Sequence, residues 1–167
     1  DFEVSCSAKI YDGTTAAALT ASVKAQSKLS TDLLTVEISG AFEDAGAADA
    51  KTVNYTITGL GGRDSGNYEI AGDEGNAAAI DGTVTGSIEK APVTVNVASN
   101  ITRVYDGTAQ SADVTAWANG GEFTDFSVSY KKDGIEVQAP TEVGTYDVVV
   151  SLGENAAANY ELQAYEA

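Results

Sequence analysis

The chain has 167 residues, a length typical of one or two domains. Its 25 acidic and 9 basic residues give a net charge of −16, and such a surface repels the phosphate groups of nucleic acids and of anionic lipids. Because the chain has no His and only one Cys, the usual zinc sites, the Ser-His-Asp and Cys-His nucleophile systems and an internal disulfide are excluded.

The first 90 residues show the alternation of apolar and polar residues that is typical of half-buried strands. The alternating runs are 2–10, 19–23, 34–38, 53–57 and 83–88. Turn signals of the Asp-Gly or Gly-Gly type stand at 12–13, 61–62 and 81–82. Residues 16–25 are rich in Ala, but Leu19, Ala21 and Val23 alternate, so the sequence predicts a strand there. For residues 45–50 it predicts a loop or one helical turn.

A junction without a Gly/Ser-rich spacer follows at residues 87–95. Pro92 has no N–H to donate, so it suits the first residue of a strand, and it also restricts the backbone of Ala91. The sequence therefore predicts two domains, 1–90 and 91–167, joined by a short and stiff connection.

The second domain has the same strand period in the runs 93–97, 126–130 and 146–152. Its turn signals stand at 106–107, 120–121 and 133–134. Residues 142–148 have the spacing acid-x-Gly-x-Tyr-x-hydrophobe, in which Gly144 and Tyr146 hold the fixed positions. This spacing is typical of the tyrosine corner of immunoglobulin-like domains, where the Tyr hydroxyl bonds to upstream backbone. Trp117 is predicted to be a core aromatic residue.

Two motifs of the first domain recur in the second in the same order, which indicates a tandem of two related units. Residues 9–14 recur as 103–108, and residues 66–70 recur as 158–162. The repeated Tyr, Asp and Gly residues are Tyr11, Asp12, Gly13 and Tyr68 in the first unit and Tyr105, Asp106, Gly107 and Tyr160 in the second. After Tyr68 the first unit continues into the run 83–88, whereas seven residues follow Tyr160. We therefore expect the second unit to lack its last strand and to present an open edge.

Short strands separated by turns predict an all-β chain of two tandem antiparallel β-sandwich (immunoglobulin-like) domains. The alternative fold is a pair of small β-grasp-like sheets, each with a short helix. A helix at 16–25 would favour that alternative.

The Tyr-Asp-Gly-Thr motifs, the Asn-Tyr pairs at 67–68 and 159–160 and the junction at 88–95 resemble the YDG-type and MBG-type (bacterial Ig-like) repeats of bacterial cell-surface adhesin-like proteins. The resemblance covers nearly the whole chain, with the first domain closer to the YDG type and the second closer to the MBG type. It implies an extracellular location, on the bacterial surface or in the cell wall. It also implies a stalk or adhesion role among neighbouring repeats of a larger protein, and no catalytic residues.

The repeated Tyr and Asp residues have two interpretations, a recognition surface or a structural turn. We favour the turn, because Asp-Gly supplies turn geometry and the Tyr packs at a strand end. Tyr68 and Tyr160 are likewise expected in the core or at a corner. Acidic loops at 43–49 and 73–76, and the Asp12 and Asp106 turns, are candidates for calcium. None has the spacing of a calcium loop, so we expect solvated loops.

We expect a non-catalytic structural or adhesive segment, with no catalytic, cofactor or metal residues. The apolar stretches are far shorter than the roughly 20 residues of a membrane span, so we expect no membrane insertion and, from the charge, no nucleic-acid partner. The alternative is a module that itself binds a host glycan or protein, through Trp117 near Asn119 or Tyr130 near Lys131. Exposure of Trp117 would favour binding, and burial of Trp117 and Tyr146 would favour the stalk.

Overall fold

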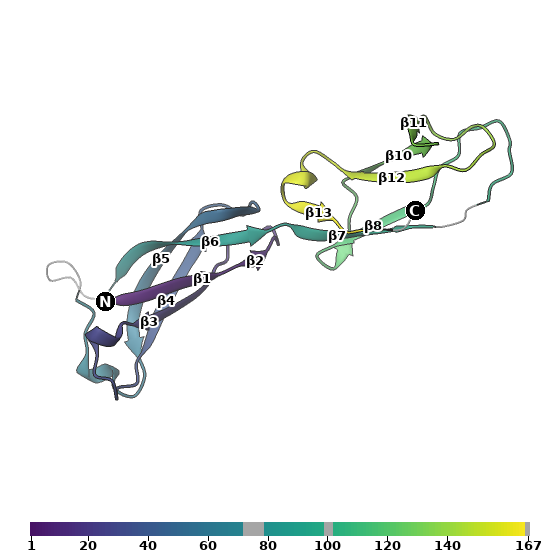
Figure 1. Ribbon diagram of the computed structural model, residues 1–167. Helices are drawn as coiled ribbons and strands as arrows, with labels where there is room; N and C mark the ends of the chain where they lie inside the picture. The colour runs from purple at the N-terminus through teal and green to yellow at the C-terminus, as the bar shows by residue number, and fades with distance from the viewer. Residues whose placement is uncertain (72–78, 99–101, 166–167) are drawn as a thin grey trace. The chain divides into compact units, whose positions relative to one another are not determined.

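The computed structural model describes residues 1–71, 79–98 and 102–165 (Figure 1). Within these residues every helical element is three residues long and the rest of the regular structure is β-strand, so the predicted all-β class is confirmed. The chain divides into two compact units, unit 1 (Asp1–Glu89) and unit 2 (Lys90–Ala167). The domain boundary predicted from the sequence lies one residue from this division.

In the described part of unit 1 the strands form two sheets. The elements are β1 (Phe2–Ser7), β2 (Lys9–Ile10), β3 (Ala18–Val23), η1 (Ala25–Ser27), β4 (Thr35–Phe42), β5 (Ala48–Gly61), η2 (Ser65–Asn67) and β6 (Ile80–Glu89). The larger sheet has the order β2-β6-β5-β4, in which only the β2–β6 pair is parallel. Strands β1 and β3 form a separate antiparallel pair.

The core of unit 1 lies between these two sheets. Phe42, Val53 and Ile88 of the larger sheet are buried, and Cys6 and Leu19 of the β1–β3 pair pack against them. Burial of one Ile or Val side chain contributes about 1.5–3 kcal/mol. The inward-facing residues of the alternating runs therefore hold the two sheets face to face.

The described part of unit 2 also forms two sheets. Its elements are β7 (Ala91–Val97), β8 (Val114–Ala118), β9 (Gly121–Glu122), β10 (Phe126–Lys132), β11 (Ile135–Val137), β12 (Asp147–Leu152), η3 (Ala156–Ala158) and β13 (Tyr160–Leu162). One sheet has the order β13-β7-β8-β9, with β13 parallel to β7, and the other has the order β11-β10-β12. The turn between β10 and β11 has positive φ at Asp133 (52°) and Gly134 (78°), as a two-residue hairpin of the predicted Asp-Gly type requires.

The core of unit 2 lies between its two sheets as well. Val93, Val95 and Ala116 of the first sheet pack in one cluster with Val150 of the second. The rings of Phe123 and Tyr160 add an aromatic contact with centroids 4.9 Å apart. Each unit is therefore a pair of packed sheets. That their strand order is the immunoglobulin-like one stays a prediction.

Two local predictions are wrong. Residues 81–82 lie inside β6 and not in a turn, because Gly82 pairs with Tyr55 of β5 and its missing side chain leaves room for the Tyr55 ring. Residues 48–50 belong to β5 and not to a loop, and the register shift there includes Ala50 with a φ of 53°. The Ala-rich segment 16–25 contains β3, as predicted, so the helix that would favour the β-grasp alternative is absent from this segment.

Candidate functional site

The Tyr-Asp-Gly-Thr motif forms the same hydrogen-bonded turn in both units. In unit 1 the N–H and the hydroxyl of Thr14 donate to Asp12 Oδ1 at 2.9 and 2.8 Å. In unit 2 the same groups of Thr108 donate to Asp106 Oδ1 at 2.8 and 2.7 Å. Both carboxylates are therefore engaged within their own turns.

The backbone conformation of each turn favours Gly at the third position of the motif. Gly13 and Gly107 both have a φ of 77°, in the left-handed region that Gly adopts without strain. A Cβ added at either Gly would lie 4.0 Å from the hydroxyl of Tyr11 or Tyr105. The motif thus has the same local geometry in the two units.

The surroundings of the motif differ between the units. In unit 1 the motif begins in β2, which pairs with β6, and the N–H of Tyr11 donates to the Glu89 carbonyl at 2.8 Å. Tyr11 also packs against the core. In unit 2 residues 103–105 belong to no strand, and Val104 is 88% and Tyr105 61% exposed. Val104 and Tyr105 of unit 2 are therefore exposed to solvent, whereas the corresponding residues of unit 1 lie beside β6.

In unit 1 the turn has a cationic partner. Lys9 Nζ lies 2.6 Å from Asp12 Oδ1 and 2.9 Å from the Thr14 hydroxyl. The hydrogen bond from Lys9, together with those from Thr14, lowers the pKa of Asp12 from 3.8 to about 2.

In unit 2 the cation at the position of Lys9 is Arg103, and it pairs with a residue outside the turn. Arg103 lies 3.4 Å from Asp113, and the amide of Gln110 donates to Asp106 at 3.1 Å. The hydroxyl and the N–H of Thr108 still hold the pKa of Asp106 below its ordinary value.

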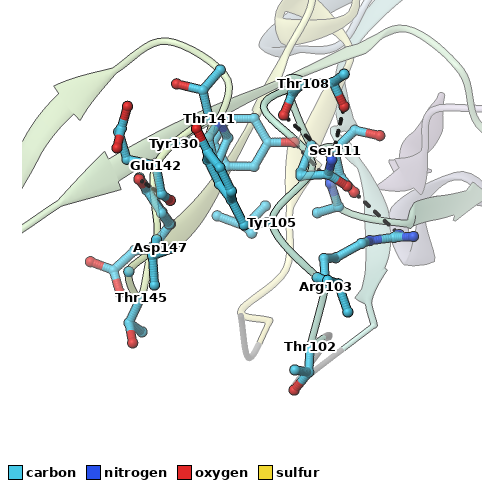
Figure 2. Close-up of a pocket in the computed structure, with 18 of the residues that line it drawn as sticks. Thr102, Arg103, Tyr105, Thr108, Ser111, Tyr130, Thr141, Glu142, Thr145 and Asp147 are labelled. Atoms are coloured by element: carbon cyan, nitrogen blue, oxygen red, sulfur yellow. Dashed lines mark hydrogen bonds between the residues drawn. The ribbon is translucent and has the colours of Figure 1, made fainter.

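A groove of about 600 Å³ opens in unit 2 beside this motif (Figure 2). One wall is segment 102–112 and the other is segment 140–148. Figure 2 shows Arg103 and Thr108 on one side and Glu142 and Asp147 on the opposite side. Exposed apolar surface of Val104 and Tyr105 belongs to this groove, which makes it the main candidate for a binding surface among the described residues.

The second wall of the groove leads into an unpaired strand edge. Within the described residues β12 pairs with β10 alone, whereas β5 of unit 1, which likewise precedes the Asn-Tyr motif, pairs with both β4 and β6. The N–H of Val150 on this edge donates to the Tyr165 hydroxyl at 2.7 Å. The sequence did not predict this role of Tyr165. No local pattern indicates that a side chain will bond to a strand edge in the place of a neighbouring strand.

Tyr146 lies where segment 140–148 enters β12. Its hydroxyl donates to the Glu142 carbonyl at 2.9 Å, the backbone bond that the tyrosine-corner spacing predicts. Lys132 Nζ lies 5.4 Å from the centroid of the Tyr146 ring. A Cβ at Gly144 would approach Lys132 Nζ to 3.0 Å, so Gly144 leaves room for this stacking.

The prediction that Trp117 is a core residue is wrong. Its side chain is 45% exposed, because β8 alternates and it is Ala116 that faces the core, at 1% exposure. The pattern Val-Thr-Ala-Trp-Ala already contained this signal, since Trp117 shares its face with Thr115. Tyr130, the other aromatic candidate for glycan binding, is buried, and its hydroxyl accepts the N–H of Ala112.

Tyr68 and Tyr160 anchor the segments around the Asn-Tyr motifs. The Tyr68 hydroxyl donates to Asp32 at 2.8 Å and accepts the N–H of Leu29 at 2.9 Å, which ties down the loop before β4. Tyr160 packs against the core of unit 2. Tyr160 therefore packs at the core of its unit, whereas Tyr68 holds a loop through its hydroxyl.

The candidate calcium positions do not converge in the part of the chain that the structure describes. The loop 73–76 lies outside the described residues. Asp44 of the loop 43–49 binds Lys51 at 2.7 Å and the N–H of Gly46, which lowers the pKa of Asp44. No cluster of three potential metal-ligating side chains occurs in the described ranges, and no helix there is long and apolar enough to cross a membrane.

Two packed-sheet units that share a turn motif define a tandem of all-β repeat domains. Residues 2–79 match the YDG domain family and residues 91–165 match the MBG domain family, so the chain consists of a YDG domain followed by an MBG domain. This confirms the recognition made from the motifs. Domains of both families are repeat-type domains of surface proteins. No curated protein and no solved structure matches the chain significantly.

Proposed function

We propose that the chain is a non-catalytic structural segment, a stalk, of a bacterial cell-surface or secreted protein. The observation that carries the proposal is that the repeated residues serve the fold. Asp12 and Asp106 are both held by the Thr of their own turns, and Tyr68 and Tyr160 fix the segments around the second motif. A repeated binding site would instead leave these polar groups without partners in their own unit.

The two cores support the same proposal. Val53 of unit 1 and Val93 of unit 2 are both 0% exposed, and each core cluster draws on one unit alone. A module with its own core can be repeated along a chain without redesign of its neighbours. Neighbouring repeats of a larger protein are the partners that this proposal requires.

Exposure of the chain on intact cells tests the location. Cells that make the protein are treated with a protease that does not cross the envelope, and the chain is followed by immunoblot. We expect loss of the chain from intact cells, with a cytoplasmic marker preserved as the control. Protection of the chain until the cells are lysed would contradict the proposal.

A direct binding role is the second candidate, and the exposure of Trp117 favours it. Cross-strand pairing places Thr94 on one side of Trp117 and Glu122 on the other, so an aromatic face lies between polar side chains. Such a surface suits a sugar ring, which stacks on the aromatic face and bonds to the polar rim. Saturable binding on a glycan array that Trp117→Ala abolishes, and Tyr105→Ala preserves, would replace the stalk by this function.

A further inference from the structure

Strands β8 and β9 are joined by a turn at Asn119 and Gly120, the only Asn-Gly pair in the sequence. Ala118 and Gly121 pair across the turn, and φ is 51° at Asn119 and 76° at Gly120. Positive φ at both central residues is the geometry of a tight two-residue hairpin. Both residues are exposed, so water and hydroxide ions reach this turn.

The residue after Asn119 leaves its backbone nitrogen accessible. A Gly has no side chain to shield its N–H, and it changes its φ and ψ at little cost. A Cβ placed at Gly120 would meet no atom within 4 Å, so no packed group confines the turn there. The other described Asn residues precede a residue with a side chain; these are Asn54, Asn67 and Asn159 before Tyr, Asn96 before Val and Asn155 before Ala. The next backbone nitrogen can therefore approach the amide carbon, Cγ, most easily at Asn119.

The turn is held by few contacts. Within the described residues no hydrogen bond engages the Asn119 side chain, whereas Asp12 and Asp106, which also precede a Gly, are bonded to the Thr of their turns. Strand β9 has two residues and stands at the edge of its sheet. Short edge elements open locally at a low free energy, so the turn can reach conformations in which the Gly120 nitrogen faces Cγ of Asn119.

We propose that Asn119 is a site of spontaneous deamidation. In the first step the Gly120 backbone nitrogen loses its proton to hydroxide and attacks Cγ of Asn119. The new N–Cγ bond closes a succinimide ring and the Cγ–Nδ2 bond breaks, so the side-chain nitrogen leaves as ammonia with a proton taken from water. Because the nucleophile and Cγ are held in one chain, the step is intramolecular and needs no enzyme.

A water molecule then opens the ring at one of its two carbonyl carbons. Cleavage of the new N–Cγ bond leaves an aspartate in an ordinary backbone, which this turn accepts, since Asp133 and Gly134 form a turn with φ of 52° and 78°. Cleavage of the original peptide bond leaves an isoaspartate, in which the main chain runs through Cγ and is longer by one carbon. This longer chain disturbs the pairing of Trp117 with Glu122. Both products add a negative charge to the hairpin that carries Trp117, whichever function the chain has.

The test ages the full chain in mildly alkaline buffer and follows each Asn by peptide mapping with electron-transfer fragmentation, which separates aspartate from isoaspartate. Two variants serve as controls. Asp133→Asn places a second Asn-Gly pair in a turn of matched φ values. Asn119→Gln keeps the amide but has a longer side chain, so that closure needs a larger ring.

We expect Asn119 to be converted at least about tenfold faster than Asn54, Asn67 and Asn159 in the folded chain, because the Gly120 nitrogen is unshielded. The rate rises with pH, Asp133→Asn gains a second site, and Asn119→Gln loses the first. Conversion of Asn119 no faster than that of the Asn residues before Tyr would overturn the proposal. Conversion that appears only after unfolding in urea would overturn it as well, because the folded turn would then protect the amide.

Discussion

At the scale of single residues, the two copies of the Tyr-Asp-Gly-Thr motif show which features of the turn come from its own residues and which come from the rest of the unit. Asp12 and Asp106 accept the same bonds from Thr, and Gly13 and Gly107 share one φ value. Only Asp12 also faces a lysine ammonium. The turn therefore needs nothing outside its own residues, and the lysine adds an electrostatic contribution in unit 1 alone.

This difference predicts the pH dependence of unit 1. Because the pKa of Asp12 is about 2 in the folded chain against an ordinary 3.8, its stabilising contribution is complete above about pH 4 and is lost as the pH falls through about 2. We expect Lys9→Met to raise the pKa of Asp12 towards 3.8, as followed by the carboxyl carbon shift in an NMR titration. Arg103→Met is the matched control and leaves the pKa of Asp106 unchanged, since Arg103 bonds to Asp113.

The single Trp gives a second prediction at this scale. Trp117→Ala removes a side chain that is 45% exposed, so we expect unit 2 to lose less than the about 3–5 kcal/mol that a fully buried Trp would cost. Urea unfolding followed by circular dichroism measures the loss. In the parent chain, acrylamide should quench the Trp117 fluorescence readily. Weak quenching together with a large loss of stability would mean that the side chain is buried.

At the scale of elements, the edge of β12 distinguishes the two units. Among the residues that the structure describes, β5 has a strand on each side, and β12 has a strand on one side and a tyrosine hydroxyl on the other. A buried N–H without any partner costs about 1–3 kcal/mol. Tyr165 therefore stabilises the edge at Val150 through its side chain.

This arrangement predicts the effect of removing one hydroxyl. Tyr165→Phe should destabilise unit 2 by about 1 kcal/mol, the usual net value of one hydrogen bond, and should accelerate exchange at the Val150 N–H. Tyr105→Phe is the control, since the Tyr105 ring is 61% exposed and its loss of a hydroxyl should leave stability unchanged. Equal effects of the two substitutions would show that the Tyr165 bond contributes nothing.

At the scale of the whole molecule, the chain is two cores on one polypeptide. The cluster around Val53 and Ile88 belongs to unit 1, and the cluster around Val93 and Val150 belongs to unit 2. Each cluster lies between the two sheets of its own unit. Stability should therefore be a property of each unit, as expected of domains that have their own hydrophobic core.

Core substitutions test this independence. Ile88→Ala should destabilise unit 1 by about 2–5 kcal/mol, and Val150→Ala should destabilise unit 2 by about 2 kcal/mol. In calorimetry we expect each substitution to lower the midpoint of one transition and to leave the other in place. A single transition that shifts with either substitution would contradict independent units.

The sequence by itself determined the features that depend on neighbours along the chain. Period-2 alternation identified strands such as β7 and β10, the Asp-Gly dipeptides at 12–13 and 133–134 identified turns, and the two recurring motifs identified the tandem. The spacing around Tyr146 likewise anticipated its bond to Glu142, because donor and acceptor are four residues apart.

Only the tertiary structure decided which face of a strand is covered and by what. Residues 81–82 stay in a strand because the Tyr55 ring lies across Gly82. Tyr11 lies beside a strand and Tyr105 borders a groove although their turns are alike. The physical reason is common to both: the environment of a residue depends on the strand that lies alongside, and that strand comes from a distant part of the sequence.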